Sequence, residues 1–287
     1  MTKGRRVAMA GIGASILTLL GFRPRANAGS STERDFSNLP PADLLREAQR
    51  TAPLVSDVLA SAARLLRPGV TTDHLHAAIE KGLAERNLGP AMKGYNGYPF
   101  CATFSVNEEI LHGLPSSRRL QAGDILKIET GSFTSRGFAS QGWTFPVTRP
   151  SESDSRLIAT ATQALRAAQA AIRSGARVGD ISHAIQTTVE AQGLAVVRQF
   201  VGYGMGAKRI QEPAIPCYGR QGLGAKLREG QILNVHVILK AGSPDVSIAE
   251  NGWTAVASDG KHGALKSCMM EVEAKGCRLL GRVLDPS

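Results

Sequence analysis

The sequence predicts one α+β domain built from two related halves, each with two helices followed by strands. Its 287 residues are 43% hydrophobic and 20% charged, which is typical of a globular chain and enough for one large domain. Helical and strand-like stretches alternate from Pro41 onward, and no later low-complexity segment separates a second domain. The same order of elements then occurs twice.

Apolar spacing predicts the individual elements. In the first half, helices are expected over 43–66 and 72–86, and strands over 100–106, 125–133 and 138–147. In the second half, helices are expected over 155–174 and 178–192, and strands over 232–239, 253–257 and 269–273.

The two halves also align residue by residue. Gly69 corresponds to Gly175, and Glu129 corresponds to His236. Two halves related by a pseudo-twofold axis would share one sheet with helices on one face. Glu129 and His236 are therefore expected near a central cleft.

Residues 1–28 are predicted to be an export signal. A basic start with Arg5-Arg6 precedes an apolar stretch from Val7 to Phe22 and a small-x-small cleavage site at 26–28. The arginine pair favours twin-arginine export; a general secretory signal is the second alternative and an uncleaved anchor the third. The mature protein is then expected in the periplasm or outside the cell, without stable membrane insertion. Residues 29–41 form a polar linker.

The formal net charge of +10 at pH 7 does not predict a nucleic-acid partner. Part of it falls in the signal, and there is neither a run of five like charges nor a basic helix interleaved with aromatic residues. The four cysteines lack a CxxC spacing, which argues against a thiolate zinc site; they are either buried thiols or form up to two disulfides.

Several motifs resemble a known family. Gly94-Tyr95-Asn96-Gly97-Tyr98-Pro99 and the segment 105–115, with His112-Gly113-Leu114-Pro115, resemble the start of the type I methionine aminopeptidase catalytic domain. Gly202-Tyr203-Gly204-Met205-Gly206 and Asn251-Gly252-Trp253-Thr254 continue the resemblance in order. It covers residues 42–282, leaving 283–287 as a tail. It implies the pita-bread fold of the M24 family, in which pseudo-twofold halves pack helices on a curved antiparallel sheet.

The resemblance also implies five positions at which the family holds two divalent metals. Here these degenerate metal positions are Glu129, Gln141, Tyr203, His236 and Ser267, and none keeps the family's residue. One carboxylate remains where the family has four, and hard divalent ions need oxygen anions and imidazoles in the right number. The sequence therefore predicts no metal and no cofactor, with one weakly held ion on Glu129, Gln141 and His236 as the less favoured alternative.

The candidate catalytic residues are His112, His236 and Glu129. His112 matches the family's first active-site histidine, whereas Ile210 stands at the second. A Glu129–His236 dyad is expected, with the carboxylate raising the imidazole pKa. The alternative is that each histidine is a buried residue satisfied by a neighbour. Cys268 is either a nucleophile activated by His236 or, more commonly for such a residue, a buried thiol.

The resemblance implies a pocket for an amino-terminal side chain. Its candidate residues are Met92, Tyr95, Tyr98, Tyr203, Arg209 and Trp253. Arg209 replaces a phenylalanine of the family, so the selectivity of the pocket is expected to differ. Tyr203 either donates a hydrogen bond or fills the space of the metals.

Two functions follow from these expectations. The first is an exported, metal-free pseudoenzyme that binds a peptide amino terminus or a small amide. The second is a metal-independent enzyme that uses His112, Glu129 and His236 to hydrolyse or cyclise a small amino-acid-derived or peptidic substrate. A scaffolding role for the outer surface is a third alternative. The ligand and the oligomeric state stay open.

Overall fold

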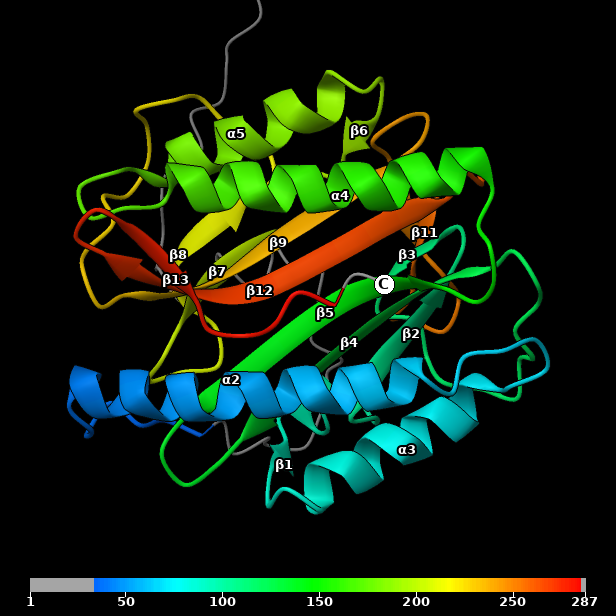
Figure 1. The fold of residues 1–287 in the computed structure, drawn as a ribbon, viewed down its shortest axis with the longest axis horizontal. Coiled ribbons are helices and arrows are strands. Elements are labelled where there is room, and N and C mark those ends of the chain that lie inside the picture. The colour runs from blue at the N-terminus through cyan, green and yellow to red at the C-terminus, as the bar shows by residue number, and fades with distance from the viewer. Residues whose placement is uncertain (1–33, 285–287) are drawn as a thin grey trace, which may run out of the picture.

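A ten-stranded sheet runs through the middle of residues 34–284, the part of the chain that the computed structural model describes, and helices cover one face (Figure 1). Its neighbouring strands are all antiparallel. The main path is β1 (Gly89–Pro90), β4 (Ile125–Phe133), β5 (Phe138–Pro146), β12 (Gly263–Glu273), β9 (Ile232–Lys240), β7 (Val201–Met205) and β8 (Gln211–Pro216). Off this path, β2 (Ala102–Val106) pairs with β4, β6 (Ala195–Val196) with β9, and β13 (Gly276–Leu279) with β12.

The helices divide between the two halves. The helices α2 (Pro41–Ala63) and α3 (Thr72–Ala84) cover the first half, with α2 on β4 and β5. In the second half, α4 (Glu152–Ala171) packs on β9 and β12 beside α5 (Val178–Glu190). This arrangement confirms the predicted pita-bread fold, with helices packed on an antiparallel sheet.

Side-chain caps and prolines set the helix starts. Thr71 accepts a hydrogen bond from the His74 N–H at 3.2 Å, and Ser151 accepts one from the Asp154 N–H at 3.1 Å. Because Ser151 caps α4, this helix begins at Glu152, three residues before its predicted start. Pro41 is the first residue of α2, a position at which the missing N–H costs nothing.

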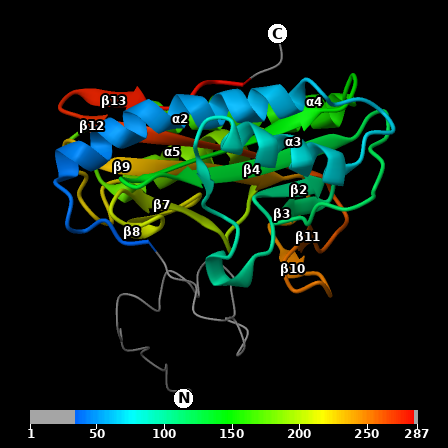
Figure 2. The same cartoon turned by 90° about the horizontal axis from the view of Figure 1, so that it is seen from below.

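The sheet register sorts the central residues onto two faces. Glu129 pairs with Gly142, Gly142 with Ser267, and Ser267 with His236, so these four share one face, called the pocket face below. Their neighbours along the strands point to the helix face, because successive side chains alternate. Seen at right angles, the helices lie on one side of the sheet and a small second sheet on the other (Figure 2). That small sheet consists of β10 (Val246–Ile248), β11 (Ala255–Ala257) and β3 (Glu109–Leu111).

The four cysteines are free thiols, three of them buried and Cys277 partly buried. No disulfide joins Cys101, Cys217, Cys268 and Cys277 within residues 34–284. Burial raises the pKa of the Cys101 and Cys217 thiols to about 12 and that of Cys277 to about 11. These three thiols are therefore protonated near neutral pH.

The predicted signal at 1–28 and residues 29–33 of the predicted linker lie outside the described residues. Among the helices that are described, none has the length and apolar character needed to cross a membrane.

Candidate functional site

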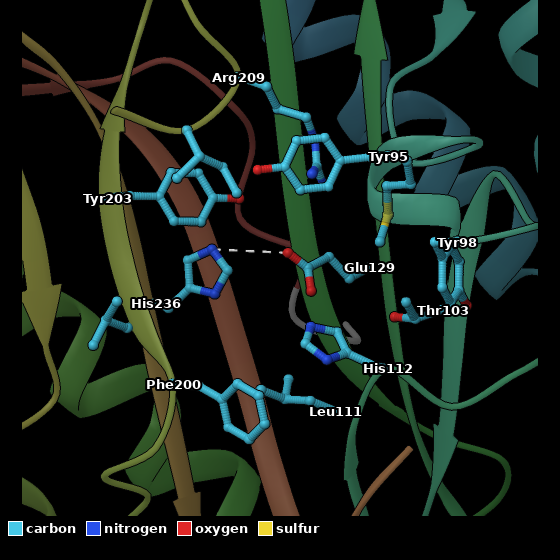
Figure 3. Close-up of a pocket in the computed structure, with 13 residues that line it drawn as sticks. Tyr95, Tyr98, Thr103, Leu111, His112, Glu129, Phe200, Tyr203, Arg209 and His236 are labelled. Atoms are coloured by element: carbon cyan, nitrogen blue, oxygen red, sulfur yellow. Dashed lines mark ion pairs between the residues drawn. The ribbon is translucent and has the colours of Figure 1, made fainter. Parts of the chain in front are cut away.

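A pocket opens on the pocket face, at the centre of the shared sheet (Figure 3). Its empty volume is about 560 Å³, counted out to its open mouth. Its walls come from both halves of the fold, as expected for a site on the pseudo-twofold axis. The lining residues are Met92, Tyr95, Tyr98, Thr103, Leu111, His112, Glu129, Phe200, Val201, Tyr203, Arg209, Ile210 and His236.

Glu129 and His236 face each other across the floor of the pocket. Glu129 Oε1 lies 3.7 Å from His236 Nε2, and both residues are about 95% buried, at 4% and 5% exposed. Asn234 Nδ2 lies 3.0 Å from the same Nε2 and 3.3 Å from the Tyr203 hydroxyl. This contact fits a neutral imidazole that accepts a hydrogen bond at Nε2.

Burial favours the uncharged forms of Glu129, His112 and His236. Desolvation raises the pKa of Glu129 to about 7 and lowers the pKa of His236 to about 3 and of His112 to about 4. The positive charge of Arg209 further lowers both histidine values. The expected rise of the His236 pKa is therefore wrong, because the cost of burying an imidazolium exceeds its attraction to Glu129 at this distance.

A tight turn presents His112 to the pocket. His112 has a φ of 57°, in the left-handed region that non-glycine residues rarely adopt. Gly113 anchors the turn, since its N–H donates to Ser105 Oγ at 2.9 Å and its carbonyl accepts from the Phe104 N–H at 2.8 Å. The His112 ring stands edge-on against Phe200, with ring centroids 5.3 Å apart. Strain held in this way is common at functional sites.

Gln141 does not lie in the pocket. It sits on the helix face, where it accepts a hydrogen bond from the Ser56 hydroxyl of α2 and its amide donates to the Arg282 carbonyl at 2.6 Å. Cys268 lies on the same face, 3.5 Å from Gln141 Nε2. Cys268 is therefore separated from His236 by the sheet and cannot serve as its nucleophile.

Ser267 stays on the pocket face beneath the lining residues. It is fully buried, and its Oγ has no hydrogen-bond partner among the described residues. Asn234 Oδ1 is likewise buried and unpartnered within residues 34–284.

The residues at the five degenerate metal positions do not fit a pair of divalent metals. Gln141 points away, and the remaining side chains on the pocket face are one carboxylate, one imidazole and two hydroxyls. Across residues 34–284, no group of three or more His, Cys, Asp or Glu side chains is arranged to hold a metal ion. Two divalent ions need more anionic oxygen than Glu129 supplies.

The pocket also contains residues that the sequence did not indicate. These are Thr103, Leu111, Phe200 and Val201. Thr103 pairs with Glu129 across β2 and β4, a contact visible only in the register. The other three are next to the motifs around His112 and Tyr203 in the sequence. That proximity is the sequence signal by which they could have been predicted as pocket residues. Trp253 does not line the pocket but stands edge-on to Tyr98, with ring centroids 5.1 Å apart.

Known proteins similar to this chain are peptidases. Methionine aminopeptidase 1 of Bacillus subtilis is 35% identical over 240 residues, which cover 84% of this chain and 96% of the relative. Methionine aminopeptidase A of Synechocystis is 35% identical over 237 residues, covering 82% of this chain and 92% of the relative.

These relatives overturn the expected function. The relatives compared are named methionine aminopeptidases, and no name among them describes an exported protein or a metal-free binding protein. The loss of the family's metal ligands therefore does not by itself make the chain a pseudoenzyme, and the metal-independent alternative lacks support for the same reason. The expected periplasmic or extracellular location is also corrected, because nothing in these matches supports a signal peptide.

Solved structures and the family match agree with the fold. The crystal structure of methionine aminopeptidase from Thermotoga maritima has a TM-score of 0.82 and 31% identity, covering 84% of this chain and 97% of that one. The enzyme from Rickettsia prowazekii gives a TM-score of 0.82 at 27% identity, covering 84% and 98%. Residues 43–273 match metallopeptidase family M24. With the pita-bread sheet, the central pocket and these matches together, the chain belongs to metallopeptidase family M24.

Proposed function

We propose that this chain acts on the amino-terminal residue of peptides, which it holds in the pocket above Glu129. The observation that supports this most directly is the position of the pocket. It lies on the shared sheet at the pseudo-twofold axis, in a chain 35% identical to methionine aminopeptidases over 84% of its length. The aminopeptidase reaction of those relatives is the activity to test first.

The pocket's own residues suit a short peptide end. Aromatic and aliphatic side chains, among them Tyr95, Tyr98 and Leu111, form walls that can shield the first side chain of a bound peptide from water. Polar groups gather at the floor, where Glu129, the Tyr203 hydroxyl and His112 can hydrogen-bond an amine or an amide.

No step of the reaction is assigned to a metal, because the donor set does not fit the pair of ions that the family name implies. What the chain's own residues supply is binding, orientation and exclusion of water. Glu129 has the pKa closest to neutrality in the pocket, at about 7. Its carboxyl group can thus hold or release a proton there.

The test uses the full chain and tripeptide amides that begin with different residues. Binding is measured by calorimetry and release of the first residue by mass spectrometry, in the presence and absence of manganese or cobalt. Peptides with a free amino group are expected to bind, and the same peptides with an acetylated amino group are expected to bind at least about tenfold more weakly. If neither free nor acetylated peptides bind or are cleaved, the proposed function is wrong.

A further inference from the structure

Arg209 is a buried cation on the wall of this pocket. It follows β7 in the loop that leads to β8, and it is 7% exposed. Figure 3 shows its side chain reaching down beside the Tyr95 ring toward Glu129. The guanidinium carbon lies 4.4 Å from the centroid of that ring.

Hydrogen-bond partners for this guanidinium are missing within residues 34–284. Its Nε is buried without a partner, and no ion pair or hydrogen bond joins Arg209 to another described residue. Stacking on Tyr95 stabilises the cation, since an aromatic face attracts a guanidinium. A ring face does not accept the in-plane N–H groups, which point along the edge of the guanidinium plane.

Glu129 is not an ion-pair partner for the Arg209 guanidinium. It is the only carboxylate among the residues that line the pocket, and it forms no ion pair with Arg209. Glu129 Oε1 lies 3.7 Å from His236 Nε2, and the positive charge of Arg209 partly offsets the burial that raises the pKa of Glu129, without an ion pair between them. Buried charges in folded proteins are normally paired, so an arginine left open toward a pocket favours an anionic ligand group.

We propose that Arg209 makes the pocket selective for peptides whose first residue carries a carboxylate side chain, either aspartate or glutamate. This inference rests on the proposed function, since it names the amino-terminal residue that the pocket would prefer. A planar guanidinium matches a carboxylate with two parallel N–H···O bonds, a geometry that a neutral amide or a thioether cannot reproduce. Glu129 then remains available for the peptide's amino group.

The experiment compares three ligands of nearly equal size: Glu-Ala-Ala amide, Gln-Ala-Ala amide and Met-Ala-Ala amide. The carboxamide end removes the terminal carboxylate, so the side chain is the only anion. Calorimetry on the full chain is expected to show that the glutamate peptide binds at least about tenfold tighter than its glutamine counterpart, the range for a hydrogen bond to a charged group. Equal affinity for the glutamate and glutamine peptides would overturn the inference.

A pair of variants assigns the preference to Arg209. In Arg209→Met the ratio of glutamate-peptide affinity to glutamine-peptide affinity should fall to about one. The matched control is Arg198→Met, because Arg198 also stacks on a tyrosine, Tyr218 at 5.1 Å, but is exposed and outside this pocket. This control should keep the full preference. A preference that persists in a folded Arg209→Met variant contradicts the inference.

Further arms separate the other outcomes. If Arg209→Met does not fold, the comparison of glutamate and glutamine peptides on the unmodified chain still decides the question. The affinity of Ala-Ala-Ala with a free carboxyl end is compared with that of its amide. If the free acid binds tighter than the amide, but the glutamate peptide binds no tighter than the glutamine peptide, Arg209 recognises the carboxyl end of the peptide and the selectivity is refuted. Failure of all peptides, methionine included, refutes the proposed function. Binding of methionine and glutamine peptides without a gain for glutamate refutes the selectivity alone.

Discussion

Replacing Gly204 with alanine tests how the second half of the fold positions Tyr203. A Cβ at Gly204 would lie 2.2 Å from the Glu212 carbonyl oxygen and 2.7 Å from its carbon. Both atoms belong to the backbone of β8, so no side-chain rotation relieves the contact. The two strands must separate, and the pairing of Gly204 with Gln211 is expected to break.

The expected loss of stability follows from this clash. Overpacking a tight contact typically costs about 1–3 kcal/mol, and each lost backbone hydrogen bond adds about 1 kcal/mol, so Gly204→Ala should cost roughly 3 kcal/mol. In a domain of this size that is a fall in Tm of roughly 6–12 °C. Because Tyr203 precedes Gly204 and Arg209 follows in the same hairpin, peptide affinity should fall as well.

Thermal unfolding followed by circular dichroism measures the effect, with Gly276→Ala as the control. Gly276 lies in β13, has no atom within 4 Å of an added Cβ, and does not have a positive φ. The control should therefore be neutral or slightly stabilising. If Gly204→Ala were as stable as Gly276→Ala, the close approach of β7 to β8 would not be what holds Tyr203.

Three further substitutions test other parts of the structure. The Lys240 ammonium, 2.7 Å away, holds the pKa of Asp259 well below its usual 3.8, so the stability from this pair is present above pH 3.8 and lost as the pH falls below it. Asp259→Asn should therefore lower the Tm by several degrees at pH 7, and by progressively less in melts below pH 3.8. Ser56→Ala should cost about 1–2 kcal/mol and speed amide hydrogen exchange at Arg282, whose N–H donates to Ser56 Oγ, while peptide affinity measured by calorimetry stays unchanged. Tyr98→Phe removes the hydroxyl whose single proton is shared between the Ala102 and Gly113 carbonyls, each 3.2 Å away, and should cost about 1 kcal/mol in chemical unfolding.

The helices and central strands could be predicted because their apolar spacing is regular. The strand expected over 125–133 matches β4 residue for residue. By contrast, β7 and β8 were missed, since Gly202 and Gly204 interrupt the first and Pro213 the second. These glycines are required by contacts to neighbouring strands, a tertiary effect that local propensity does not contain.

The strand β12 shows a second limit of sequence patterns. It was expected over 269–273 but begins at Gly263, because polar residues such as Lys266 and Ser267 are buried within it. Lys266 places its ammonium 3.9 Å from the Trp143 ring centroid, which makes a buried lysine tolerable. A lysine in a run of residues is normally taken as a solvent-facing position, so the predicted strand began too late in the chain.

The chemistry of the site depends on a register that no motif match reveals. Aligned by sequence, Gln141 occupies a metal-ligand position, yet Gly142 is the residue opposite Glu129. A shift of one residue along a strand moves a side chain to the other face of the sheet. An acid at position 141 would therefore point toward α2 and Ser56, whereas a side chain at position 142 would meet Leu265, Ser267 and Glu129 at 3.0–3.3 Å. The pocket face has little room for the second carboxylate that a pair of metals would need. Its selectivity is thus expected to depend on the groups that do reach the pocket, Arg209 above all.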